Sequence, residues 1–289
     1  MTPFDEAVLP AGVRVAQVSA WREGRTSHHP DWLAQEVPVA LVFNGISHAV
    51  MLASPHDLAD FALGFGLTEG LLDSPGDLYG CEEVVTPQGI ELQLTVAAAC
   101  EWRLKDRRRH LAGRTGCGLC GTESLGQVQR ALPTVPALQL TPAAVGRALR
   151  DLRQWQAVQQ LTGASHAAAW CTLAGEIALV REDIGRHNAL DKLVGALVRA
   201  RTDSAQGWVL VTSRASFEMV QKTAMAGAGA LVAVSAPTAL AVDVARQCGL
   251  ALAGFARGTD FVAYTHPTRF GLDSPSVAPN STRFLASGA

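Results

Sequence analysis

The second half of the chain alternates continuously apolar runs with amphipathic stretches, and this alternation restricts the fold more than any other feature. Residues 207–213 (GWVLVTS) and 230–235 (ALVAVS) have no polar face, as expected for strands that are covered on both sides of a sheet. Amphipathic runs follow each of them, and the run at 238–249 ends at a glycine that suits a helix C-terminus. Strands that alternate with helices indicate a mostly parallel sheet covered on both faces, a three-layer α/β sandwich.

The first half has a β-rich pattern. Residues 37–52 form two β-rich runs around Asn44-Gly45, a dipeptide that supplies the positive φ angles of a tight hairpin turn. We also expect a strand at 13–18, a loop at 24–30, a helix at 54–72 that opens on a Ser-Pro cap, and a strand at 90–96.

A proline-rich stretch separates the two patterns. Residues 132–142 (LPTVPALQLTP) contain three prolines, which break regular elements. We therefore predict an α+β chain with an N-terminal β-rich domain at 1–135, a C-terminal α/β domain at 136–271 and a loose tail at 272–289. The further elements expected in the C-terminal domain are a helix at 142–161, strands at 166–173 and 176–182, a helix at 186–201, a helix through Met219 and Met225, and strands at 250–256 and 260–265.

Composition and charge exclude several classes of protein. A net charge of −2 argues against general nucleic-acid binding, which needs a broad basic surface. No apolar run approaches the roughly 18–20 residues that a membrane span needs. The acidic start, MTPFDEAVLP, lacks the basic and apolar regions of a secretory signal. We therefore expect a cytoplasmic protein that binds neither nucleic acid nor membranes.

Two of the six cysteines, Cys117 and Cys120, lie three residues apart in the glycine-rich strip AGRTGCGLCG (112–121). A structural zinc site usually needs two such halves, and a thioredoxin-type pair opens a helix, which these glycines disfavour. The basic run at 102–114 precedes the pair, and nearby cations favour the nucleophilic thiolate. A nucleophile is favoured over a metal half-site, a redox pair and an incidental pair. The other four cysteines have the pattern of single buried thiols.

Polar side chains gather where three expected strands end. Such runs occupy residues 181–192 (REDIGRHNALDK), 212–222 (TSRASFEMVQK) and 234–238 (VSAPT). In α/β sheets ligands bind at the carboxyl ends of strands, where helix N-termini accept anions. Three such turns favour an anionic ligand over three ordinary helix caps. The residues singled out for contact with a phosphate are Arg181, Arg186, His187, Lys192, Ser213, Arg214 and Ser216.

Standard motifs for the competing chemistries are absent from the sequence. No Walker A loop is present, and the one G-x-G-x-x-G string, GCGLCG (116–121), is the cysteine strip itself and does not follow an expected strand. The H-x-E and P-C-x-x-C signatures of zinc deaminases and the G-x-S-x-G elbow of α/β-hydrolases are missing as well. We therefore predict no metal site and neither of these hydrolytic activities.

Five blocks, taken together and in this order, resemble the formate dehydrogenase accessory sulfurtransferases, the FdhD/NarQ family. They are GRTGCGLCG, REDIGRHNALDKL, SRASFEMVQK, VSAPTALAV and GFARG, and the resemblance covers about residues 35–270. It implies a C-terminal domain similar to the cytidine deaminase fold, without the deaminase zinc site.

The resemblance also implies a function and its residues. Family members are cytoplasmic sulfurtransferases that take persulfide sulfur from a cysteine desulfurase. They pass it to the molybdenum cofactor, in its bis-guanine-dinucleotide form, for formate dehydrogenase. Cys117 matches the persulfide cysteine and Cys120 the supporting one. The family's cofactor segment falls on Phe255, Ala256, Arg257, Gly258, Thr259 and Asp260.

From the polar turns at the strand ends and the family resemblance together, we expect the phosphates of the cofactor near Ser213, Arg214 and Arg257, with His187 and Lys192 as further neighbours. GDP is then a suitable surrogate ligand, because it resembles half of the dinucleotide, and we expect a homodimer. Two alternatives stay open: a chaperone that holds the cofactor without moving sulfur, and a thiol–disulfide oxidoreductase built on Cys117 and Cys120.

Overall fold

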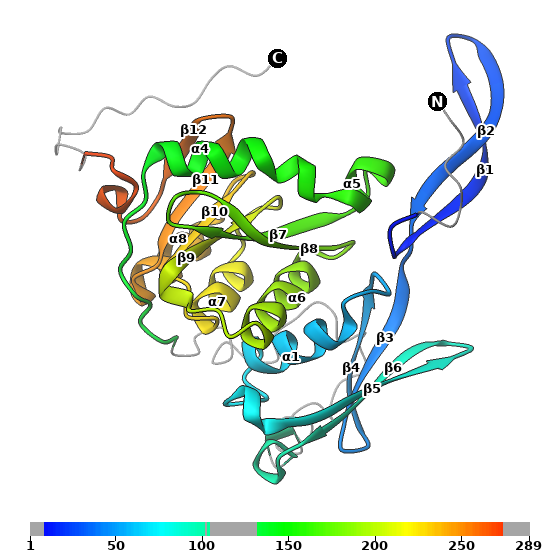
Figure 1. Ribbon diagram of the computed structural model, residues 1–289, viewed down its shortest axis with the longest axis horizontal. Coiled ribbons are helices and arrows are strands. Elements are labelled where there is room, and N and C mark those ends of the chain that lie inside the picture. Colours follow the sequence, from blue (N-terminus) through cyan, green and yellow to red (C-terminus); the bar gives the residue numbers. More distant parts are fainter. Residues whose placement is uncertain (1–8, 102, 105–131, 274–289) are drawn as a thin grey trace.

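The computed structural model describes residues 9–101, 103–104 and 132–273, and these residues form three sheets. A two-stranded ribbon and a four-stranded sheet come from the first hundred residues, and a six-stranded sheet comes from the second half (Figure 1). The α/β class and the three-layer C-terminal sandwich predicted from the sequence are confirmed. The predicted domain boundaries stay a prediction.

The ribbon pairs β1 (Val13–Arg22) with β2 (Arg25–Ala34) and extends away from the rest of the chain (Figure 1). The predicted strand at 13–18 is confirmed, but the predicted loop at 24–30 is wrong. Glu23 and Gly24 both have positive φ angles, 49° and 78°, which make a tight two-residue turn. Residues after the turn therefore return along β1 as a strand, and Ser19 hydrogen-bonds His28 across the ribbon at 2.9 Å.

The four-stranded sheet has the order β4-β3-β6-β5. Its strands are β3 (Val37–Phe43), β4 (Ile46–Ala53), β5 (Leu78–Thr86) and β6 (Gly89–Val96). Asn44 and Gly45 form the predicted turn between β3 and β4, with φ angles of 46° and 78°. Sequence reasoning missed β5, because Glu82 and Glu83 interrupt its apolar alternation.

Helix α1 (Leu58–Thr68) covers one face of this sheet, and we call the sheet and α1 the N-terminal unit. The predicted start of α1 is wrong. Asp57, in a left-handed conformation, precedes the first turn, and the Ser54 side chain is fully buried instead of capping the helix. The core between helix and sheet consists of Val39, Leu41, Phe43, Leu58, Phe61, Leu63, Phe65, Leu92, Leu94 and Leu104.

The six-stranded sheet has the order β12-β11-β10-β9-β7-β8. Its strands are β7 (His166–Thr172), β8 (Ile177–Asp183), β9 (Gly207–Val211), β10 (Ala230–Ala233), β11 (Ala251–Arg257) and β12 (Asp260–Ala263). The prediction of a mostly parallel sheet is wrong in its pairing, because only β9, β10 and β11 pair in parallel. Two hairpins, β7–β8 and β11–β12, add antiparallel strands at the flanks.

Helices cover both faces of this sheet, and we call the sheet with its helices the C-terminal unit. Helices α6 (Arg186–Arg199), α7 (Phe217–Met225) and α8 (Ala239–Cys248) pack on one face (Figure 1). Helix α4 (Pro142–Asp151) covers the other face and leads into η3 (Leu152–Trp155) and α5 (Ala157–Thr162). The single helix predicted at 142–161 is therefore wrong, since Gln156 leaves the helical conformation between η3 and α5.

Helix α1 of the N-terminal unit packs directly against α6 of the C-terminal unit (Figure 1). The two helices approach closely at Gly64 and Gly195. A Cβ on Gly64 would overlap the carbonyl oxygen of Asp191, and one on Gly195 would overlap that of Asp60. Glycines thus let the two backbones touch, and α1 joins both units.

Candidate functional site

The turns that follow β8, β9, β10 and β11 meet at one edge of the six-stranded sheet, as the sequence predicted. We call this the strand-end edge; it comprises residues 184–187, 212–216, 234–238 and 255–259. Backbone hydrogen bonds join neighbouring turns: Thr238 N to Ala215 O at 3.0 Å, and Phe255 N to Ser235 O at 3.1 Å. The segments singled out from the sequence are therefore neighbours in space.

Arg186 and His187 begin α6 at this edge. His187 Nε2 lies 2.9 Å from Glu218 Oε2 at the start of α7, which brings the two helix N-termini together. The close approach of His187 lowers the pKa of Glu218 against the opposing effect of burial. Within the described residues the Nε of Arg186 is buried and has no hydrogen-bond partner. Arg186 therefore retains a donor for a ligand.

The other predicted contacts lie further along the edge. Arg214 and Arg257 are exposed, but Ser213 is buried and its hydroxyl donates to the carbonyl of Arg214 at 3.0 Å. Phe255 is half exposed with a φ of 52°, an unusual conformation for a bulky residue and one that recurs at functional sites. The two arginines and the strained phenylalanine are available to a ligand.

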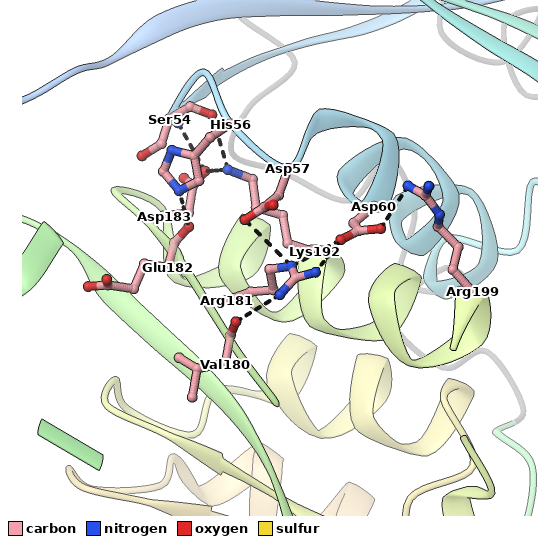
Figure 2. A network of polar contacts seen from close by, with 10 residues as sticks. All are labelled: Ser54, His56, Asp57, Asp60, Val180, Arg181, Glu182, Asp183, Lys192 and Arg199. Atoms are coloured by element: carbon pink, nitrogen blue, oxygen red, sulfur yellow. Dashed lines mark hydrogen bonds and ion pairs between the residues drawn. The ribbon is translucent and has the colours of Figure 1, made fainter. Parts of the chain in front are cut away.

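Lys192 has a different environment from the one predicted. Its side chain is completely buried, and its ammonium pairs with Asp183 at 2.7 Å and donates to the Ser54 carbonyl at 3.0 Å (Figure 2). Burial lowers the pKa of Lys192, and Asp183 opposes that effect. The charge of Lys192 is thus neutralised inside the protein, where it connects the two units.

Asp183 is the centre of this connection. One carboxylate oxygen accepts from the backbone of Ser54 at 2.9 Å and pairs with Lys192. The other accepts from Gly185 N at 2.8 Å and from the Asn188 amide at 3.1 Å. Every oxygen of this buried carboxylate is therefore occupied, which is the condition under which a buried charge is tolerated.

Two more ionic clusters join the units. Arg181 donates to Asp60 at 2.7 Å, and Arg199 donates to the other oxygen of that carboxylate at 3.1 Å (Figure 2). Arg181, a predicted phosphate contact, thus faces α1 and not the strand-end edge.

The last cluster is centred on Lys222. Its ammonium contacts Glu69 at 2.7 Å, Asp191 at 3.0 Å and the Thr68 hydroxyl at 3.0 Å. Sequence reasoning missed this role, because Thr68 and Glu69, at the C-terminal end of α1, lie more than a hundred residues away in the sequence. The three charged clusters together form what we call the inter-unit joint.

Cys117 and Cys120 lie outside the described residues, as does most of the basic run at 102–114. The segment that carries them follows Leu104, which is buried in the N-terminal core, and precedes Leu132, which packs against the C-terminal core. In sequence it therefore connects the two units.

The four described cysteines are poor nucleophiles. Cys100, Cys171 and Cys248 are buried, and burial raises the pKa of each thiol. Cys81 is half-buried, and burial, helped by Glu83, raises its pKa to about 11. Since the thiolate is the reactive form, these four thiols are shielded from exchange at neutral pH.

Alkylation of the native protein is expected to separate the two kinds of cysteine. At pH 7.5, iodoacetamide should modify Cys117 and Cys120 and leave the other four unmodified, as peptide mass spectrometry would show. A thiol becomes reactive as the pH rises through its pKa, so labelling of Cys81 should increase only as the pH approaches 11. Rapid labelling of Cys81 at pH 7.5 would contradict this assignment, and denatured protein provides the full-labelling control.

Among the described residues, no group of three or more histidine, cysteine, aspartate or glutamate side chains is arranged to hold a metal ion. None of the described helices is long and apolar enough to cross a membrane.

Comparisons with known proteins agree with this arrangement. The model of the FdhD/NarQ family matches residues 34–271. The Sulfur carrier protein FdhD of Variovorax paradoxus (strain S110) is 58% identical over 270 residues, 93% of this chain and 97% of that protein. The protein of the same name from Cupriavidus necator is 57% identical over 253 residues, 87% of this chain and 88% of that protein.

A solved structure shows the same fold. The crystal structure of a protein from Desulfotalea psychrophila, assigned as a formate dehydrogenase accessory protein, aligns with a TM-score of 0.71. It covers 89% of this chain and 99% of that one, at 21% identity.

Fold and joint together define a class of protein in which an α/β sandwich is connected through buried ion pairs to a smaller β-sheet unit. Because the family model and the similar relatives span most of the sequence, the chain belongs to the FdhD/NarQ family, and the predicted membership is confirmed.

Proposed function

We propose that this protein is a sulfur carrier required for formate dehydrogenase activity. It takes persulfide sulfur from a cysteine desulfurase and transfers it to the molybdenum cofactor in its bis-guanine-dinucleotide form. The observation that carries the proposal is the 58% identity, over 97% of its length, to a relative named Sulfur carrier protein FdhD. The shielding of the four described cysteines supports it, because it leaves Cys117 and Cys120 as the thiols for exchange.

Sulfur loading is an ordinary thiol exchange. The Cys117 thiolate attacks the terminal sulfur of the desulfurase persulfide, the S–S bond breaks, and the desulfurase cysteine leaves as a thiolate. Release of that sulfur as sulfide requires two electrons. A second thiolate supplies them when it attacks the inner sulfur and a disulfide forms, and Cys120 is three residues away in the sequence.

The strand-end edge is the proposed binding site for the cofactor, which is the substrate of the transfer. The cofactor has several phosphates, and Arg186, Arg214 and Arg257 carry charge at the edge and form no ion pair with an acidic side chain among the described residues. Arginine suits phosphate because its guanidinium offers paired donors. His187 stays in the proposed set as the partner of Glu218, and Lys192 is left out because it is buried in the inter-unit joint.

Binding of GDP is expected to depend on these arginines. Removal of one charged hydrogen-bond partner costs about 1.5–3 kcal/mol, so Arg214→Ala and Arg257→Ala should each bind GDP roughly 10- to 100-fold more weakly. Calorimetry on both variants, with Arg246→Ala as a control on the exposed outer side of α8, measures the effect. Parental affinity in both variants would remove the strand-end edge from the proposal.

Labelling tests the sulfur-carrier function directly. The purified protein is incubated with a cysteine desulfurase and ³⁵S-cysteine. We expect label on Cys117 that is lost to reductant, and a persulfide on the corresponding peptide by mass spectrometry. A protein that binds GDP but never acquires label is a cofactor chaperone. A reversible Cys117–Cys120 disulfide without label is the mark of a thiol–disulfide oxidoreductase.

A further inference from the structure

A pocket of about 500 Å³ lies next to the strand-end edge, between α5, the start of β7 and the end of β8. Its volume is in the range of pockets that hold small ligands. Two of its lining residues belong to motifs identified from the sequence: Ile184 in 181–192 and Thr212 at the start of 212–222. The lining includes Gln156, Gln159, Ser165, His166, Ile184 and Thr212.

The wall of the pocket is held in place by Glu182, a buried carboxylate. It accepts hydrogen bonds from the backbones of Val158 and Gln159, both at 2.9 Å, and from the Ser165 hydroxyl at 2.8 Å. The Gln159 side-chain oxygen in turn accepts from Ser165 N at 2.8 Å. These bonds fix α5 against the β7–β8 hairpin, so the pocket is pre-formed.

Gln156 is the unusual residue of this wall. It is 8% exposed, yet among the described residues no hydrogen bond to its side-chain amide is found. The amide has an acceptor oxygen and two N–H donors, and these atoms stay accessible from the pocket. A ligand that presents a donor and an acceptor side by side would satisfy it, and the edge of a nucleobase does so.

The pocket adjoins the cationic part of the strand-end edge. His166, in the pocket wall, pairs with Asp183 in the β7–β8 ladder, three residues before Arg186. Ile184, also in the pocket wall, lies two residues before Arg186. Burial and the charge of Arg186 lower the pKa of His166, and Asp183 opposes them. Arg186 also retains its unpaired buried donor. A base in the pocket would thus have phosphate-binding groups beside it.

We propose that this pocket holds a guanine base of the cofactor, with the Gln156 amide hydrogen-bonded to the base edge and the attached phosphate directed to Arg186 and His187. The identity of the base rests on the proposed function. The pocket itself rests on the cavity and on the unpartnered amide. Gln156 is then the residue that recognises the base, and the arginines of the edge recognise phosphate.

Calorimetry with GDP and with inorganic pyrophosphate separates these roles. Gln156→Leu should weaken GDP binding roughly 5- to 100-fold, the effect of one unsatisfied hydrogen-bonding group, and leave pyrophosphate binding unchanged. Arg186→Ala should weaken both ligands. Gln154→Leu, which changes an exposed glutamine in the neighbouring η3, is the matched control and should bind both ligands like the parent.

Gln156→Glu adds a rescue that a purely structural role would not produce. A carboxylate accepts both N–H groups on the guanine edge, so this variant should recover most of the GDP affinity and should reject ADP. If Gln156→Leu also binds pyrophosphate more weakly, the leucine has disturbed the phosphate-binding residues of the strand-end edge. Recovery of GDP binding in Gln156→Glu then supports the proposal, and absence of recovery overturns it.

Two further results would overturn the base pocket. Gln156→Leu binding GDP like Gln154→Leu would place the base elsewhere, while loss of affinity in the arginine variants and ³⁵S transfer to Cys117 would leave the proposed function intact. A parent protein that binds pyrophosphate as tightly as GDP would show that no base is recognised. Failure of ³⁵S transfer alone would instead refute the sulfur-carrier function and leave the pocket standing.

Discussion

Replacing Cys117 with alanine is expected to abolish formate dehydrogenase maturation, whereas Cys120→Ala should retain part of it. The reason is the different chemistry proposed for the two thiols: Cys117 would carry the sulfur, and Cys120 would assist its release, which an external thiol can also do. No described cysteine can substitute, since Cys100, Cys171 and Cys248 are buried and the pKa of Cys81 is about 11. The measurement is formate dehydrogenase activity in cells that contain each variant as their only copy, beside ³⁵S labelling of the purified variants.

Cys81→Ala is the matched control for this experiment, because Cys81 is the one described cysteine that is not fully buried. It should mature the enzyme like the parent. Full activity in Cys117→Ala would refute the carrier mechanism. Equal and complete loss in both variants would instead favour a disulfide-based reaction, in which neither thiol works alone.

Much of the fold is predictable from the sequence because its signals are local. The apolar strands β9 and β10 are unmistakable, and Asn44-Gly45 identifies the β3–β4 turn through its backbone preference alone. The errors lie in segments whose own sequence pattern is weak and whose structure depends on pairing with another segment. Residues 25–30 lack a strand pattern, and they become part of β2 because the Glu23-Gly24 turn and β1 provide a pairing surface.

The candidate site, like the fold, could be predicted only in part. Motif positions placed the turns at the strand-end edge, since the carboxyl ends of strands in one sheet converge there. The motifs did not reveal which charges face a ligand. Arg181, Lys192 and Lys222 belong to the same polar blocks as Arg186 and Arg214, yet their partners are Asp60, Asp183 and Asp191 in the inter-unit joint. Side-chain direction depends on α1, a helix from the other end of the sequence, so no local pattern carries it.

The pocket proposed to hold a base was missed for a related reason. Gln156 lies in a stretch predicted as continuous helix, where a glutamine is an ordinary solvent-exposed residue. The stretch packs over the β7–β8 hairpin for two reasons. The helix breaks between η3 and α5, and the buried Glu182 carboxylate accepts a hydrogen bond from the backbone of α5. A polar residue becomes informative when the structure places it in the wall of a pocket without a protein partner for its side chain.

Lys192→Met is expected to lower the free energy of unfolding by about 3–5 kcal/mol, the usual result of breaking a buried ion pair from one side. Methionine matches much of the aliphatic stem, but it leaves the Asp183 carboxylate and the Ser54 carbonyl without their cation. Urea denaturation measures the change. Arg246→Met is the matched control, because its pair with Asp243 is about 60% exposed and such pairs contribute less than about 1 kcal/mol.

The same variant decides between the two roles considered for Lys192. If the ammonium belongs to the inter-unit joint, Lys192→Met loses stability and, at a temperature where it is folded, binds GDP nearly as tightly as the parent. If the ammonium contacts a phosphate, the variant loses GDP affinity while its urea midpoint stays with that of Arg246→Met. The structure favours the first result, because a side chain with no exposed surface and an aspartate at 2.7 Å has no donor directed toward a ligand at the strand-end edge.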